Sequence, residues 1–200
     1  MVFSVSEIID MIIMTVIVGY VFSDFLAQYQ PKKQTENYDP LAQYLKPKQD
    51  FWQKFLFAVS VGAPAIILHE FGHKFVAIFF GATASFQAAY GFLLLAIILK
   101  IFKSPFIFFV PAYVAFSGNL NSTEVGLIAL AGPVVNVLLW AISKYIVYLL
   151  TTHKKLGRKY GKYIPYFVVS AKINGFLAIF NMIPIPGFDG YHVFTQFFLR

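Results

Sequence analysis

The chain alternates long apolar runs with short polar segments. The runs long enough to cross a bilayer lie at residues 8–25, 54–80, 125–150 and 163–183. At about 1.5 Å of rise per residue, a helical run of this length reaches roughly the 30 Å thickness of the hydrocarbon core. A fifth apolar region, residues 90–109, predicts either a bent span or a re-entrant hairpin. The pattern predicts an all-α polytopic membrane protein with about five to six transmembrane helices.

Two short stretches interrupt this helical pattern. Residues 83–88 and 111–118 are β-branched, aromatic or small, and Gly81 marks the end of the helix before them. They predict two strands that flank the fifth apolar region. We expect them to form a small membrane-associated β-hairpin close to the candidate chemistry described below.

The polar segments leave no room for a second domain. Residues 28–50 predict an aqueous loop, and no polar stretch is long enough to fold alone. We therefore expect one membrane-embedded domain over residues 1–200, in which residues 1–53 add an N-terminal span and a polar loop to a core at 54–200. The start of the chain carries Glu7 and no Lys or Arg before the first run, unlike a signal peptide, so that run is expected to be retained.

Composition supports the membrane prediction and sets its orientation. Hydrophobic residues make up 58% of the chain and charged residues 12%, against about 25% charged in soluble proteins. The net charge of +7 does not indicate a nucleic-acid partner, because the Lys and Arg residues lie between the apolar runs, as the positive-inside rule expects. Residues 153–162 hold five basic residues and no acid. We expect a multi-pass protein of the cell membrane with this loop on the cytoplasmic side.

The 54–80 run carries the strongest candidate chemistry, in His69, Glu70 and His73. Residues four apart lie on one face of a helix, so the two imidazoles can offer ring nitrogens to one Zn²⁺. Glu70 lies beside them and can handle protons. The chain has no cysteine, so a transition-metal site must use histidine and carboxylate ligands.

A catalytic zinc usually has three protein ligands and one open position, so a third ligand is expected after His73. The remaining candidates are Glu124, His153, Asp189 and His192. Glu124 precedes the 125–150 run and is explained by compensation of the helix dipole. His153 lies in the basic loop, where neighbouring cations would repel a metal.

Asp189 is the strongest of these candidates. It lies in a segment broken by Pro and Gly and flanked by apolar residues, and irregular backbone at membrane depth is tolerated where it lines a cavity. The alternative is an interfacial turn in which Gly190 takes a positive φ. His192 is a possible substitute ligand or supporting group, although a structural role is favoured.

Asn136 and Asn181 are two further polar residues that have apolar neighbours on both sides. Each could make hydrogen bonds between helices. The functional alternative is that an amide donor stabilises the oxyanion formed when water attacks a peptide carbonyl.

Three motifs together resemble the site-2 protease family of intramembrane zinc metalloproteases. Residues 69–73 resemble its metal-binding helix, residues 131–136 its Gly-x-x-x-Asn element, and residues 181–190 its Asn-x-x-Pro-x-Pro-x-x-Asp-Gly signature. The motifs occur in the family's order, and the resemblance covers about residues 54–198.

The resemblance implies a zinc metalloendopeptidase, a hydrolase with one Zn²⁺ per chain that cleaves transmembrane protein substrates. It implies zinc ligation by His69, His73 and Asp189, and general acid/base chemistry by Glu70. Asn136 and Asn181 would have accessory polar roles toward the substrate or the oxyanion. A strand at residues 111–118 could hold the unwound substrate by edge pairing.

Two other classes remain open. A membrane ion or metal transporter could use His69, His73 and Asp189 as an ion relay, although it needs no Glu70. A membrane zinc protease of the prenyl-protein processing type would take a downstream Glu as its third ligand, and Glu124 is the candidate for that role.

Overall fold

The computed structural model describes residues 2–31, 50–104 and 110–199. Most of the predicted polar loop at 28–50, and the end of the 90–109 region, therefore lie outside the described residues. The longer helices are α1 (Val5–Ala27), α2 (Phe51–Phe79), α3 (Tyr90–Ile101), α4 (Ser122–Thr152), α6 (Ile164–Asn181) and α7 (Asp189–Phe198). Two strands, β1 (Thr83–Ala88) and β2 (Ala112–Ser117), and the short helices α5 (Lys154–Tyr160) and η1 (Gly161–Tyr163) complete the set.

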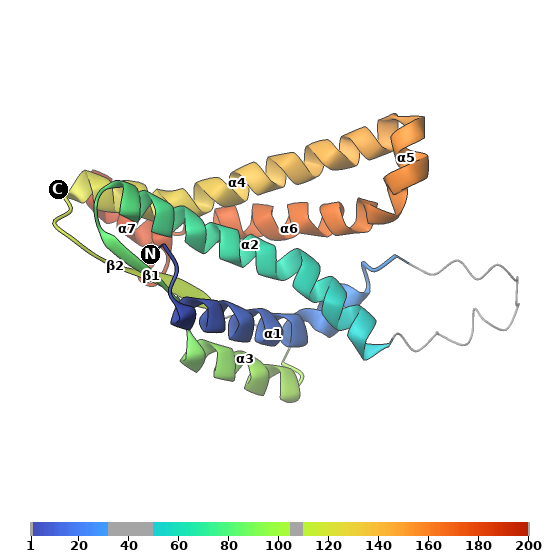
Figure 1. The fold of residues 1–200 in the computed structure, drawn as a ribbon, viewed down its shortest axis with the longest axis horizontal. Coiled ribbons are helices and arrows are strands. Elements are labelled where there is room, and N and C mark those ends of the chain that lie inside the picture. The colour runs from blue at the N-terminus through green and yellow to red at the C-terminus, as the bar shows by residue number, and fades with distance from the viewer. Residues whose placement is uncertain (1, 32–49, 105–109, 200) are drawn as a thin grey trace, which may run out of the picture.

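The helices form a bundle with a small sheet at one end. The metal-binding candidate helix α2 packs against α4 and α6 on one side and α1 on the other, and α3 packs on α1. Figure 1 shows the sheet, α7 and both chain ends at one end of the bundle, and α5 at the opposite end. The predicted helical fold class with a small β-hairpin is confirmed.

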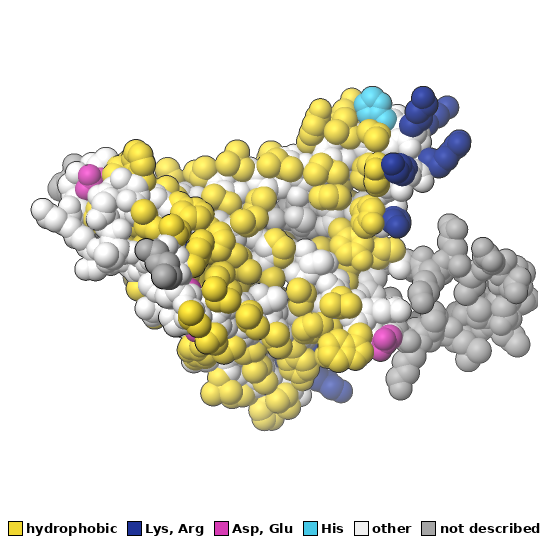
Figure 2. All heavy atoms as spheres, viewed as in Figure 1, with side chains coloured by type: hydrophobic (Ala, Val, Ile, Leu, Met, Phe, Trp, Pro, Cys, Tyr) yellow, Lys and Arg dark blue, Asp and Glu magenta, His cyan; other side chains and the backbone are white. Residues whose placement is uncertain are grey.

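Within the described ranges, four helical segments are long and apolar enough to cross a membrane. They are α1, α2, α4 and the run Lys154–Asn181 that ends with α6. Figure 2 shows hydrophobic side chains over the middle of the molecule and Lys and Arg side chains gathered near α5. This distribution matches the alternation of apolar runs and basic segments along the sequence.

The start of α1 and the end of α2 each follow from local sequence. Ser4 and Glu7 form a capping box, in which each side chain accepts a hydrogen bond from the other residue's backbone N–H. At the end of α2, Gly81 has a φ of +82°, and the N–H of Ala82 donates to the carbonyl of Ala77. This is a Schellman ending, which suits glycine and turns the chain into β1.

The two strands form the predicted hairpin across the fifth apolar region. They pair antiparallel, with Ala88 opposite Ala112. The 90–109 region leaves the sheet after β1 and returns to it at β2, and its helix α3 has 12 residues, or about 18 Å. This length is shorter than the roughly 30 Å hydrocarbon core, and the N–H of Ala89 donates to the carbonyl of Pro111 where the two strands meet.

Two segments differ from the sequence expectations. The basic stretch expected to be a loop is helical, because α5 and η1 follow α4 after His153. In the Pro/Gly-broken segment, the positive φ belongs to Gly187 (+98°) and not to Gly190, which is helical in α7. Gly190 serves close packing instead, since an added Cβ would lie 2.3 Å from the carbonyl of Met182.

Candidate metal centre

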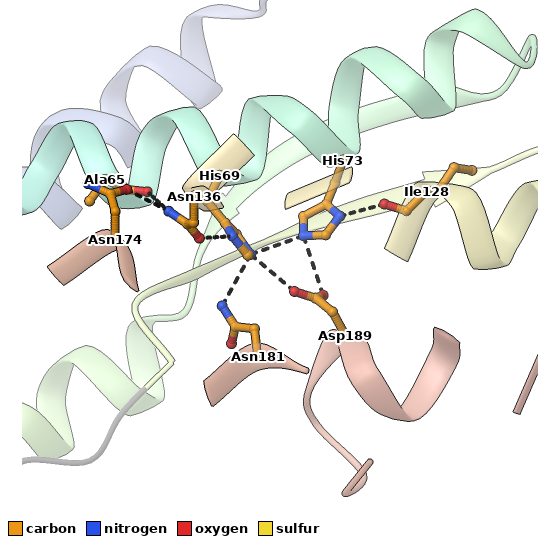
Figure 3. A network of polar contacts seen from close by, with 8 residues as sticks. All are labelled: Ala65, His69, His73, Ile128, Asn136, Asn174, Asn181 and Asp189. Atoms are coloured by element: carbon orange, nitrogen blue, oxygen red, sulfur yellow. Dashed lines mark hydrogen bonds and ion pairs between the residues drawn. The ribbon is translucent and has the colours of Figure 1, made fainter. Parts of the chain in front are cut away.

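The two histidines of α2 point their Nε2 atoms at one place. Their side chains are buried, and the Nε2 atoms of His69 and His73 lie 3.1 Å apart. The four-residue spacing places both rings on the same helix face, as the sequence predicts. Figure 3 shows both rings directed toward the first turn of α7.

Asp189 reaches the same place from the start of α7. Its Oδ2 lies 3.1 Å from Nε2 of His69, and its Oδ1 lies 3.3 Å from Nε2 of His73. The chain reverses between α6 and α7 through the positive φ of Gly187, and Gly190 lets α7 begin against the end of α6. Among the described residues, these three are the group of metal-ligating side chains that the structure brings together.

The distances fit a zinc ion. Tetrahedral zinc with ligand bonds of about 2.0–2.1 Å separates its ligand atoms by about 3.3 Å, close to the spacings observed here. The other ring nitrogen of His73 lies 2.7 Å from the carbonyl oxygen of Ile128. A carbonyl only accepts, so Nδ1 of His73 carries the hydrogen and leaves the Nε2 lone pair for a metal.

Asn136 orients the other histidine from α4. Its Oδ1 accepts from Nδ1 of His69 at 2.6 Å, and its Nδ2 donates to the carbonyl of Ala65 at 3.1 Å and to Oδ1 of Asn174 at 2.8 Å. Both amide hydrogens are therefore engaged between helices, and the side chain is fully buried. This geometry matches the helix-to-helix role considered from the sequence and leaves no donor for an oxyanion.

Asn181 is placed differently. It ends α6 and lies partly exposed, with Nδ2 3.4 Å from Nε2 of His69 (Figure 3). Its amide thus contacts Nε2 of His69, the nitrogen that faces the cluster, whereas Asn136 contacts Nδ1. Of the two asparagines, Asn181 is the one whose donor can reach a group bound beside the cluster.

Glu70 and the cluster line one cavity of about 920 Å³. The same cavity is lined by β2, α1 and α6, including Ala112, Val114 and Phe116. The Glu70 side chain is buried, with 6% exposure. An enclosed carboxylate beside a metal cluster is placed to exchange protons with a group held in that cavity.

Two glycines let α2 and α4 approach closely enough to form the site. A Cβ on Gly132 would lie 2.3 Å from Nε2 of His73 and 2.7 Å from Cε1 of His69. A Cβ on Gly72 would lie 2.8 Å from the carbonyl oxygen of Ala131. Both positions belong to the motifs found in the sequence, and their small size is needed at the helix contact.

The other candidates lie away from the cluster. Glu124 forms a capping box with Asn121 at the start of α4, as dipole compensation predicts. His153 is exposed at the junction of α4 and α5. His192 lines the cavity but does not belong to the metal-ligating group.

Sequence reasoning did not single out two buried polar residues. Asn174 supports Asn136 from α6, and Lys74, which follows His73, is fully buried and pairs with Glu7 of α1. Each lies inside an apolar run, and a polar or charged residue in such a run is the signal that could have identified both.

Comparison with known proteins adds one relative. The chain is 33% identical over 192 residues to a protein of Methanocaldococcus jannaschii named "Putative zinc metalloprotease", and the match covers 96% of this chain and 84% of that protein. No protein-family model matches the chain, and no solved structure matches it.

Proposed function

The chain belongs to the zinc metalloprotease family of its Methanocaldococcus jannaschii relative, and from this premise we propose that it is an intramembrane protease of the site-2 type. It would hydrolyse peptide bonds within or next to the transmembrane segments of membrane proteins. The observation that carries this proposal is the convergence of His69, His73 and Asp189 in a cavity between helices long enough to span a bilayer.

The position of the cluster along α2 supports cleavage at membrane depth. His69 lies ten residues before the end of α2 at Phe79 and eighteen residues after its start at Phe51. At about 1.5 Å per residue, these separations are about 15 Å and 27 Å. If α2 spans the bilayer, the cluster lies inside the hydrocarbon layer, nearer to the end that carries the sheet.

The ligand set defines the chemistry available. His69, His73 and Asp189 would hold the zinc, which in such sites polarises a carbonyl and activates a water molecule. Asn136 and Ile128 hold the two imidazoles in the tautomer that leaves Nε2 free.

Glu70 and Asn181 would supply the proton transfer and the oxyanion hydrogen bond that the zinc ligands do not provide. Glu70 would accept the proton of the attacking water and return a proton to the leaving amine. Asn181 would donate its amide hydrogen to the oxyanion, because its Nδ2 faces the cluster. The hydrogen bonds of Asn136 and the position of Asn181 support Asn181 for the oxyanion role, which the sequence left as one alternative for both residues.

The sheet offers a way to hold an unwound substrate. A transmembrane helix hides its peptide carbonyls in its own hydrogen bonds, so it must unwind before attack. Among the described residues, β2 pairs only with β1, and β2 lines the cavity. A substrate segment could therefore add as a third strand beside β2. We expect a substrate with a Gly/Pro break to be cleaved faster than one with an uninterrupted helix.

Two substitutions test the proposal. Glu70→Gln removes the proton acceptor and should lower cleavage of a membrane-spanning peptide by roughly 10²–10⁴-fold while zinc stays bound. Asp189→Ala removes a ligand and should lower the zinc content itself. The assay compares purified protein in proteoliposomes by product formation and by metal analysis, with Asp24→Asn as a control because Asp24 pairs with Lys54 and Lys100 away from the cavity.

The outcomes separate the competing functions. Retained cleavage in both variants would contradict the proposal. Ion flux through wild-type liposomes without peptide hydrolysis would favour the transporter alternative instead.

A further inference from the structure

Two acidic residues of α1 occupy the outer edge of β1. Oε1 of Glu7 accepts a hydrogen bond from the backbone N–H of Phe86 at 2.7 Å, and Oδ2 of Asp10 accepts from the N–H of Ala88 at 3.2 Å. Asp10 also accepts a hydrogen bond from the hydroxyl of Tyr90. Carboxylates thus take the place of a neighbouring strand along this edge.

These bonds determine which groups face the other edge of the sheet. The backbone N–H and C=O of one residue in a strand point to the same side, and the sides alternate along the strand. Because Phe86 and Ala88 face α1, their register partners Val114 and Ala112 are non-hydrogen-bonded partners and face away from β1. Phe116 follows the same alternation.

The free edge of β2 therefore lies over the cavity. Its outward backbone groups belong to Ala112, Val114 and Phe116, and all three residues line the cavity that holds the metal cluster. One edge of the sheet is closed by α1. The other has no neighbouring strand in the part of the chain that the structure describes, and it faces the site.

The closing carboxylate is also tied to the metal-binding helix. Lys74, the residue after His73, is fully buried and pairs with Oε1 of Glu7, which is itself 3% exposed. The Lys74 ammonium lies 4.5 Å from the centre of the Phe3 ring. A buried ion pair inside an apolar bundle is costly unless each charge is fully satisfied. Here it joins α1, α2 and β1 at one point.

We propose that Glu7 and Asp10 are positioning residues that close the edge of β1, so that a substrate segment can add only beside β2, next to the metal cluster. This inference rests on the proposed function and specifies how the substrate is oriented. Lys74 neutralises Glu7, so the carboxylate acceptor is held at the edge without an unpaired buried charge.

The test separates hydrogen-bond acceptors from charge. The edge-open variant, Glu7→Ala/Asp10→Ala/Lys74→Met, removes the acceptors. The edge-closed variant, Glu7→Gln/Asp10→Asn/Lys74→Met, keeps amide oxygens as acceptors. It lacks the same three charges as the edge-open variant. Asp10→Ala and Asp10→Asn form a milder pair if the triple variants bind no zinc. Asp24→Asn is the control for an acid on the same helix that does not touch the sheet.

Disulfide trapping reports directly which edge of the sheet binds a peptide, because the chain has no cysteine of its own. Tyr113→Cys places a thiol on β2 and Gln87→Cys places one opposite it on β1, on the same face, since the Tyr113 hydroxyl donates to Gln87 at 2.7 Å. Strands lie about 4.8 Å apart, so a peptide beside β2 is within disulfide reach of position 113 and out of reach of position 87. The probe is a synthetic apolar peptide with one cysteine and a central Gly-Pro break, and the background is Glu70→Gln.

We expect trapping at position 113 and not at position 87 when the β1 edge is intact or amide-closed. In the edge-open variant, trapping should appear at position 87. In the enzyme that retains Glu70, the edge-open variant should raise KM roughly tenfold, because the two hydrogen bonds that hold the sheet in its substrate-binding position are lost. We expect kcat to stay within about threefold of wild type and the zinc content to be unchanged. The edge-closed variant should keep KM within about threefold of wild type.

Equal trapping at both positions in the intact protein, or equal KM in the open and closed variants, would overturn the inference. This failure is distinguishable from failure of the proposed function. Glu70-dependent cleavage with trapping at both positions rejects only the edge assignment. Trapping confined to position 113 without any cleavage rejects only the protease activity.

Discussion

Each histidine of the cluster has a second partner that determines which nitrogen faces the metal position. Asn136 supplies this partner for His69, and Asn136 is held in turn by Asn174 and the carbonyl of Ala65. Such partners of metal-bound histidines fix the tautomer and the ring orientation. The orientation of His69 therefore depends on a chain of hydrogen bonds that crosses α2, α4 and α6.

Asn136→Leu removes this chain while keeping a side chain of similar size. We expect zinc affinity to fall roughly 10–100-fold, the usual effect of losing such a partner, measured by competition with a chelator of known affinity. Asn174→Ala is the matched control, because Asn174 contacts Asn136 and not the histidine, and its effect should be smaller. Unchanged zinc affinity in Asn136→Leu would show that His69 is oriented by something else.

The contact between α2 and α4 brings the histidines to their partners. Gly132 lies against both imidazoles, and Gly72 lies against the backbone of α4. These glycines lie in apolar helices, where their value is the space that they leave for the neighbouring helix. The close packing of these two helices is thus part of the site.

Gly132→Ala should disturb the site more than the fold. The added methyl group would overlap His73, and overpacking of this kind costs about 1–3 kcal/mol. If this cost falls on the histidines, it corresponds to roughly a 5- to 150-fold loss in zinc affinity. Gly62→Ala on α2 is the control, since its added Cβ would meet its nearest neighbour, in Val18, at 3.5 Å. Zinc titration of both variants checks this, and equal affinities would contradict it.

Much of the element structure could be predicted from sequence periodicity. The strand at Thr83–Ala88 matches its predicted bounds, and α2 and α4 begin and end within a few residues of theirs. Periodicity could not show that the basic stretch after His153 is helical, because its polar composition is like that of a loop. It also could not identify the partners of Asn136, which come from two other helices and depend on packing.

The candidate ligands could be proposed from sequence because each breaks an apolar pattern. His69 and His73 lie in an apolar run, and Asp189 lies in a Pro/Gly-broken segment between two others. The edge role of Glu7 and Asp10 could not be proposed in this way. Their carboxylates act as acceptors only because β1 lies beside α1, and the hydrogen-bonded residues are 79 and 78 positions apart in the sequence.

Charge is distributed unevenly between the two ends of the molecule. The basic helix α5 lies at one end, and the sheet and α7 lie toward the other (Figure 1). The first residue of α7 is Asp189, a member of the metal cluster. If the basic end is cytoplasmic, as the positive-inside rule predicts, the cluster lies nearer to the opposite membrane surface. The cavity would then receive substrates at that depth.

Single cysteines in this cysteine-free chain can test the orientation. Asn119 lies exposed between β2 and α4, and Lys155 lies exposed in α5. We expect a membrane-impermeant maleimide to label Asn119→Cys in intact cells and Lys155→Cys only after permeabilisation. The reverse pattern would place the basic end outside and the cluster nearer to the cytoplasm.

The central claim is that peptide bonds are cleaved at membrane depth by a site that contains Glu70. The most direct measurement is mass spectrometry of the products when wild type and Glu70→Gln act on one membrane-spanning peptide in proteoliposomes. The account predicts a cut within or next to the apolar segment for wild type, loss of that cut on zinc chelation, and no cut for Glu70→Gln. Cleavage confined to the soluble ends of the peptide, or the same products from both proteins, would contradict it.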